Sequence, residues 1–145
     1  MAQIYISPDL DLSDLGDQFE TAHVHFIGLD HAGLSYHARI FLNNPKADET
    51  TPLDDDSGYA GAFHIFGHGG CFGDVGHCTV TSRRAYDPRP AHPLQPANKR
   101  VVATDAIKRE LKKGKTVTVT VVAIPVGPAD EEPLKFDELE IVAVD

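Results

Sequence analysis

The sequence predicts an all-β protein: one antiparallel β-sandwich of the cupredoxin or jelly-roll kind, with a single short α-helix, forming one domain over residues 1–145. Apolar residues recur mostly at every second position, as in strands that bury one face. With 145 residues, the chain can bury a hydrophobic core within one domain. The connecting stretches are rich in proline, glycine and aspartate. Strands of irregular spacing with one helix favour a sandwich.

Six segments carry the strand signal, at 3–7, 21–29, 35–43, 59–67, 115–126 and 136–144. In the second segment, His23 and His25 alternate with Val24 and Phe26, so the two histidines are expected to share one face. The segment 115–126 is the strongest candidate because threonine and valine alternate along it. The inward faces predicted for two further segments are Tyr36, Ala38, Ile40 and Leu42 in 35–43, and Leu139, Ile141 and Ala143 in 136–144.

The helix is expected over residues 104–115. Thr104 or Asp105 is the expected N-cap, Ile107 and Leu111 lie one turn apart, and Gly114 is the expected C-terminal stop. Loops are predicted at 43–58, 79–98 and 126–134. The second of these is rich in proline, which cannot donate a backbone hydrogen bond, so it is expected to wrap the surface rather than form a strand.

The charge of the chain argues against several classes of partner. The net charge is −9 with neutral histidines, and acidic residues gather at 9–17, 48–56 and 130–132. Such a field repels phosphate backbones, so nucleic acid is not expected as a partner. No apolar run reaches the length of a membrane span, and the first residues lack the basic and apolar regions of a secretory signal. We therefore expect a cytoplasmic chain, unless a partner exports it.

The stretch FHIFGHGGCFGDVGHC, residues 63–78, gathers histidine, cysteine and glycine. His68, Cys71, His77 and Cys78 together could form a closed zinc site. Alternatively, a Cys71–Cys78 disulfide would close a short loop and contribute about 2.5 kcal/mol in the chain-entropy model. A third interpretation is an open copper site, in which a few histidines and one or both thiols hold Cu(I) loosely. In a reducing cytosol, such a cysteine pair is more often metal-binding or redox-active than structural.

A second candidate ligand pair is His23 and His25. Histidines at i and i+2 of a strand point to the same side and can chelate one ion, whereas the alternative is a solvated strand face. His31 and His37 would approach the same region if residues 28–35 formed a tight hairpin, and His92, among prolines, is expected at the surface. The sequence has no catalytic triad spacing and no glycine-rich phosphate loop leading into a helix, which argues against a hydrolase or a dinucleotide-binding protein.

Four stretches, taken in order, resemble the C-terminal domain of tyrosinases and polyphenol oxidases. They are ARIFLNN (38–44), GYAGAFHIFGHG (58–69), VVATDAIKRELKKGKTVTVTVVAIP (101–125) and KFDELEIVAV (135–144). The resemblance covers roughly residues 20–145 and implies a β-sandwich that covers the dicopper pocket of the oxidase, often inserting an aromatic side chain in place of the substrate. Phe66 or Phe72 would then be that placeholder.

The resemblance also implies a partner and a metal. In some bacterial systems, a separate small partner covers the oxidase and delivers copper, and His64, His68, Cys71, His77 and Cys78 would be the corresponding copper-handling residues here. The dicopper centre of the family is held by histidines on a helical bundle, whereas the one predicted helix of this chain has none. By itself, the chain is therefore not expected to oxidise phenols.

Two functional hypotheses follow, with a third in reserve. In the first, the chain is a stand-alone domain that binds copper and delivers it, or uses it in redox chemistry, beside a tyrosinase-like oxidase. The ligands would come from His23, His25, His64, His68, Cys71, His77 and Cys78. In the second, it is a metal-free shielding domain with a Cys71–Cys78 disulfide. The third is the structural zinc site at residues 68–78.

Overall fold

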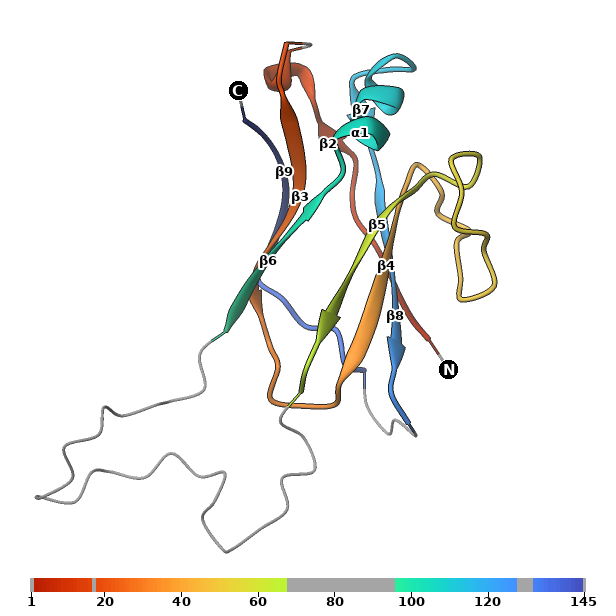
Figure 1. Cartoon of the computed structure of the whole chain (residues 1–145), viewed down its shortest axis with the longest axis vertical. Coiled ribbons are helices and arrows are strands. Elements are labelled where there is room, and N and C mark those ends of the chain that lie inside the picture. Colours follow the sequence, from red (N-terminus) through yellow and green to blue (C-terminus); the bar gives the residue numbers. More distant parts are fainter. Residues whose placement is uncertain (1, 17, 68–95, 128–131, 145) are drawn as a thin grey trace, which may run out of the picture.

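The fold consists of two antiparallel β-sheets packed face to face, as the computed structural model shows for residues 2–16, 18–67, 96–127 and 132–144 (Figure 1). One sheet has four strands in the order β1-β8-β4-β5, and the other has three in the order β6-β3-β9. Strands β2 and β7 form a small separate pair. The predicted all-β sandwich with one short α-helix is confirmed. Among the described residues, no helix is long and apolar enough to cross a membrane.

The elements follow the chain in this order: β1 (Gln3–Ile6), β2 (Leu10–Asp11), the 3-10 helix η1 (Ser13–Leu15), β3 (Thr21–Leu29), β4 (Tyr36–Leu42), β5 (Tyr59–Ile65), β6 (Ala97–Val102), α1 (Thr104–Leu111), β7 (Thr116–Val117), β8 (Val119–Pro125) and β9 (Glu138–Val144).

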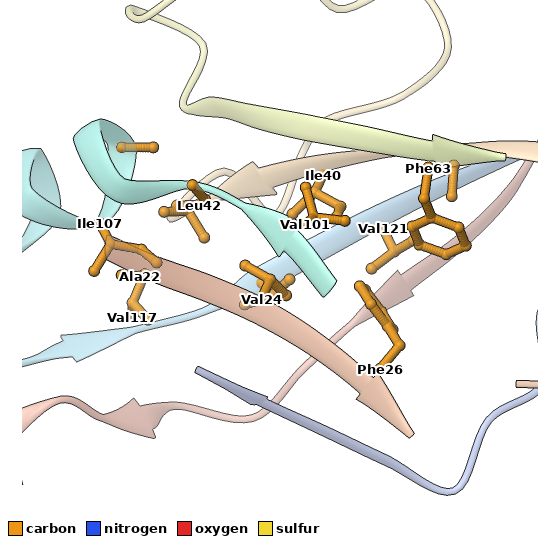
Figure 2. Close-up of a cluster of buried hydrophobic side chains, with 14 of the residues drawn as sticks. Ala22, Val24, Phe26, Ile40, Leu42, Phe63, Val101, Ile107, Val117 and Val121 are labelled. Carbon is orange, nitrogen blue, oxygen red and sulfur yellow. The ribbon is translucent and has the colours of Figure 1, made fainter. Parts of the chain in front are cut away.

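The hydrophobic core lies between the two sheets and is built from the predicted inward faces. Val24 and Phe26 of β3 are fully buried, and the centroid of the Phe26 ring is 4.9 Å from that of Phe63 in β5 (Figure 2). The Phe26 ring also packs against Phe136, with 5.4 Å between the ring centroids. The predicted inward residues of the other two strands also pack into this core: Tyr36, Ala38, Ile40 and Leu42 of β4, and Leu139, Ile141 and Ala143 of β9.

A second, smaller apolar cluster lies on the outer face of the four-stranded sheet. Phe41 alternates with the inward residues of β4 and faces outward, but it is fully buried because the loop 43–58 places Ala47 against it. Val122 of β8 completes the buried part of the cluster, and Tyr59 and Ile124 pack against it. The loop 43–58 therefore covers the outer face of the sheet around Phe41.

Three details differ from the sequence-based expectations. Residues 97–102, of which only 97 and 98 were placed in a loop and the others in no element, form strand β6 on β3. The expected single strand 115–126 is divided at Thr118, whose backbone N–H and C=O both bond to Asn43, by way of the Asn43 side chain and backbone respectively. Neither Thr104 nor Asp105 is an N-cap: the cap position is Ala103, and the Thr104 hydroxyl instead accepts a bond from the Ala22 N–H, which ties the start of α1 to β3.

The buried side chain of Tyr36 makes the free energy of unfolding depend on pH in the alkaline range. Its side chain is 1% exposed, and its hydroxyl has no hydrogen-bond partner among the described residues. Burial, with a smaller contribution from Asp30, raises the pKa of Tyr36 to about 12. In the unfolded chain the phenol ionises near pH 10, so its stabilising contribution is present below about pH 10 and is lost as pH rises towards 12. We expect Tyr36→Phe to remove this part of the alkaline loss, as measured by urea unfolding between about pH 8 and pH 11. An unchanged slope in the variant would contradict the assignment.

Candidate functional site

Two histidines stand side by side on the outer face of the four-stranded sheet. His37 of β4 and His64 of β5 are directly opposite each other in the strand register, and their ring centroids are 5.0 Å apart with an angle of 48° between the planes. His64 is exposed and His37 is half-buried. Their alternation with the buried residues Ala38 and Phe63 turns both rings away from the core. We call these two residues the imidazole pair.

Arg39 determines the protonation state and the tautomer of His37. Its Nε–H donates a hydrogen bond of 3.1 Å to Nε2 of His37, and its Nη1 donates one of 3.0 Å to the backbone carbonyl of Glu49. To accept that bond, His37 needs a lone pair on Nε2 and is therefore a neutral imidazole with its proton on Nδ1. Burial lowers the pKa of His37 below its ordinary value, and the nearby Arg39 and His64 lower it further. The ring is thus held neutral and oriented.

Phe66 lies just beyond the pair, at the end of the sandwich where β5 finishes. Its side chain is 87% exposed. The backbone behind it is nevertheless anchored, because the Gly67 N–H donates to Oγ of Ser35 at 2.9 Å, and the backbone carbonyl of Ser35 accepts from the Val126 N–H at 2.9 Å. Gly67 lies so close to Gly33 that an added Cβ would stand 2.2 Å from the Gly33 carbonyl oxygen. A large apolar ring is therefore presented to solvent from a closely packed backbone.

His23 and His25 share one face, as expected, but they lie on the other sheet. Their strand β3 belongs to the three-stranded sheet, whereas His64 belongs to the four-stranded one. Nδ1 of His25 is 3.2 Å from Oε1 of Glu140 in β9. His23 is opposite Val102 and Val142 in the two neighbouring strands, and its Nδ1 is buried without a hydrogen-bond partner among the described residues. The two predicted histidine groups thus lie on outer faces of different layers.

The connection between β3 and β4 is a crossover from one sheet to the other rather than a hairpin within a sheet. The condition under which His31 and His37 would join His23 and His25 is therefore not met. His31 instead lines an open cavity of about 470 Å³ beyond the end of β3, together with Asp30, Lys135 and Asp137. His37 finds its partner in β5.

The rest of the predicted site is carried by residues 68–95. His68, Cys71, Phe72, His77, Cys78 and His92 lie outside the residues that the structure describes, and so do the predicted disulfide and zinc site. Within the described residues, no group of three or more histidine, cysteine, aspartate or glutamate side chains is arranged to hold a metal ion. The larger metal site therefore stays a prediction, and the imidazole pair is the part of it that has defined geometry.

Sequence reasoning found His64 and Phe66 but did not place His37, Arg39 or Ser35 in the site. The alternation of β4 already put His37 and Arg39 on one face. What it could not supply was the register between β4 and β5, in which His37 is opposite His64. Ser35 is a loop residue whose role appears only when the ends of β5 and β8 are brought together.

Comparisons of the sequence with protein-family models and with curated proteins give no match. Among solved structures, the chain is similar to one described as latent aurone synthase (polyphenol oxidase) from natural source, with a TM-score of 0.56 and 18% sequence identity. The match covers 98% of this chain and 24% of that chain, so the present chain spans about a quarter of its length. At this identity the likeness establishes a shared fold, in line with the resemblance to polyphenol oxidases found in the sequence.

Proposed function

We propose that this chain is a cover domain for a tyrosinase-like copper oxidase, and that it docks on the oxidase and shields its active site. The observation that carries the proposal is the fold likeness, which extends over 98% of this chain but over only 24% of a polyphenol oxidase. Nearly the whole chain therefore corresponds to one part of a larger enzyme. The sequence resemblance, in which that part is the sandwich over the dicopper pocket, points the same way.

The described residues do not fit the dicopper centre itself. Such a centre takes histidines from the helices of a bundle, whereas α1, the one α-helix in the described part of the chain, contains no histidine. His37 and His64 are borne by strands and face outward. No oxidation step is therefore assigned to this chain, and the copper chemistry belongs to the partner.

Among the residues that the structure describes, Phe66 is the side chain best placed to enter a pocket built for phenols. A phenylalanine ring has the size and shape of a phenolic substrate without its hydroxyl group. Burying such a ring contributes about 2–3 kcal/mol to docking. The backbone next to Phe66 is anchored, because Gly67 bonds to Ser35 and Ser35 bonds to Val126. Docking of the Phe66 ring therefore costs less conformational entropy than docking of a ring on a flexible loop.

The proposal is tested with a hybrid protein, in which this chain replaces the matching quarter of the latent polyphenol oxidase. The covalent connection to the oxidase keeps the cover domain at a high effective concentration. We expect the hybrid to oxidise catechol poorly. With Phe66→Ala, kcat/KM should rise by about 10-fold or more, which is the loss of most of one ring's burial energy. Leu53→Ala is the matched control, because Leu53 is an exposed apolar residue on the loop 43–58, and it should leave the hybrid poorly active. A folded hybrid as active as the uncovered oxidase would refute the cover function.

Copper handling is a second candidate function, and the imidazole pair is the observation that favours it. Two outward imidazoles at ligand spacing lie near the start of β4 and the end of β5, and from β5 the chain continues into the sequence with His68, Cys71, His77 and Cys78. A domain that covers a copper centre and also binds copper could load its partner while docked. The Cu²⁺ titrations with the variants of His37 and His64 given below test the binding step.

A further inference from the structure

We propose that His37 and His64 form a two-imidazole binding site for a divalent first-row transition ion, with Cu²⁺ bound most tightly, on the outer face of the four-stranded sheet. The inference gives the proposed copper handling a defined binding site. It rests on that proposed function only for what the bound ion does, namely its delivery to the oxidase. Its physical basis is independent, because it comes from the register of β4 and β5 and from the contacts of the two rings.

The spacing of the rings already matches that of two ligands on one ion. A metal lies in the plane of each imidazole at about 2.0–2.1 Å from the coordinating nitrogen. Two ring centroids are then about 4.5 Å apart at the right angle of a tetragonal Cu²⁺ site and about 5.2 Å apart on a tetrahedral ion. The separation of 5.0 Å between the two rings lies between these values. Because His37 and His64 are directly opposite in an antiparallel pair, rotation about side-chain bonds brings both nitrogens to one point without a change in the backbone.

The chemistry of the pair selects the class of ion. Neutral imidazoles suit copper, zinc and nickel, and affinity for the divalent ions is highest for Cu²⁺. His37 is held in the neutral form. His64 is exposed, so water can fill the remaining coordination positions. Two ligands with water make an open site from which an ion can leave again.

Arg39 opposes this binding in a defined way. A neutral imidazole has one nitrogen with a lone pair, and Nε2 of His37 uses it to accept the Nε–H of Arg39. If an ion binds Nε2, that lone pair is taken; if it binds Nδ1, the proton moves to Nε2. In either case the hydrogen bond from Arg39 is lost, and the guanidinium charge also repels the ion. Arg39 therefore weakens the site and favours release.

This competition predicts opposite effects for neighbouring substitutions. His37→Gln and His64→Gln each remove a ligand and should weaken Cu²⁺ binding by about 10-fold or more, since even residues that only orient a ligand contribute about that much. Arg39→Met should instead tighten binding by about 2- to 5-fold, the effect expected from loss of one charge at a half-buried surface position. His31→Gln is the matched control: His31 is also half-buried, but it lies beyond the end of β3, beside the cavity lined by Lys135 and Asp137, and is not among the proposed ligands.

The experiment is a Cu²⁺ titration of the full chain and the four variants by calorimetry, with ¹H–¹⁵N spectra recorded at substoichiometric Cu²⁺. In the wild type, paramagnetic broadening should centre on the amides around residues 37 and 64, and it should disappear from there in His64→Gln. His64 is exposed, so this variant is expected to fold even if His37→Gln does not; thermal unfolding checks each.

The outcomes separate the two claims. If the wild-type chain binds Cu²⁺ but both histidine variants bind it equally well, or if broadening appears only elsewhere, the pair is not the site and the inference is overturned, while copper handling stands. If the wild-type chain binds no Cu²⁺, both the inference and copper handling fall, and the cover function is unaffected. Weakening in both variants of the imidazole pair, tightening in Arg39→Met and no change in His31→Gln would support the site.

Discussion

Phe26→Ala is expected to lower the free energy of unfolding by about 3–5 kcal/mol, the usual cost of deleting a large aromatic side chain from a core. Phe26 is fully buried between the two sheets and contacts the rings of Phe63 and Phe136. It therefore joins β3 to β5 and to the segment that leads into β9. Alanine would leave a cavity that these rings cannot fill without leaving the sheets. Because domains of this size are stable by about 5–15 kcal/mol, much of the total would be lost.

Urea unfolding followed by circular dichroism measures this loss, and Phe66→Ala provides a control of the same residue type. Phe66 is 87% exposed, so its truncation should change the free energy of unfolding by no more than about 0.5 kcal/mol. The pair of variants thus compares one ring in the core with one ring on the surface. Equal effects of the two substitutions would mean that the core does not lie where the sheets place it.

Sequence reasoning placed strands with one buried face correctly, and β8, which is buried on both faces, also lies within its predicted segment. In β3, β4 and β9, apolar and polar residues alternate along the chain, and the predicted inward residues pack in the core. Strand β6 was not recognised because three consecutive polar residues, Asn98, Lys99 and Arg100, interrupt the alternation of apolar and polar residues. Only one side chain of this strand, Val101, is buried. It follows a proline-rich stretch, and it is a strand because β3 supplies hydrogen-bond partners. Such pairing is a tertiary effect that local pattern does not encode.

The candidate site was predictable by residue type but not by position. The outward orientation of His23, His25 and His64 follows from alternation, and the structure agrees with it. Which histidines meet depends on strand order and register, and these are set by contacts between segments far apart in the sequence. His64 meets His37 because β4 and β5 are neighbours, and it is separated from His23 because β3 lies in the other sheet. A single sequence does not carry that information.

Gly58 closes the loop 43–58 onto β4 and has no room for a side chain. Its backbone is in the left-handed region, with φ at +80°, and an added Cβ would stand 2.3 Å from the carbonyl oxygen of Leu42. The approach is this close because the Leu42 N–H donates a 2.8 Å hydrogen bond to the Gly58 carbonyl. The same loop carries Ala47, which covers Phe41 on the outer face of the sheet. Gly58 therefore links the loop, the second apolar cluster and the start of β5.

Gly58→Ala is accordingly expected to lower the free energy of unfolding by about 2–5 kcal/mol, the sum of left-handed strain in an L-residue and of overpacking against the backbone. Gly114→Ala is the control: an added Cβ there meets nothing within 4 Å, and its φ is not positive. It should leave stability unchanged or raise it by about 0.4–1 kcal/mol, because alanine restricts the unfolded chain. Urea unfolding of both variants decides the matter. A Gly58→Ala protein as stable as the wild type would show that the loop does not close on Leu42, and the cover over Phe41 would then have to be formed in another way.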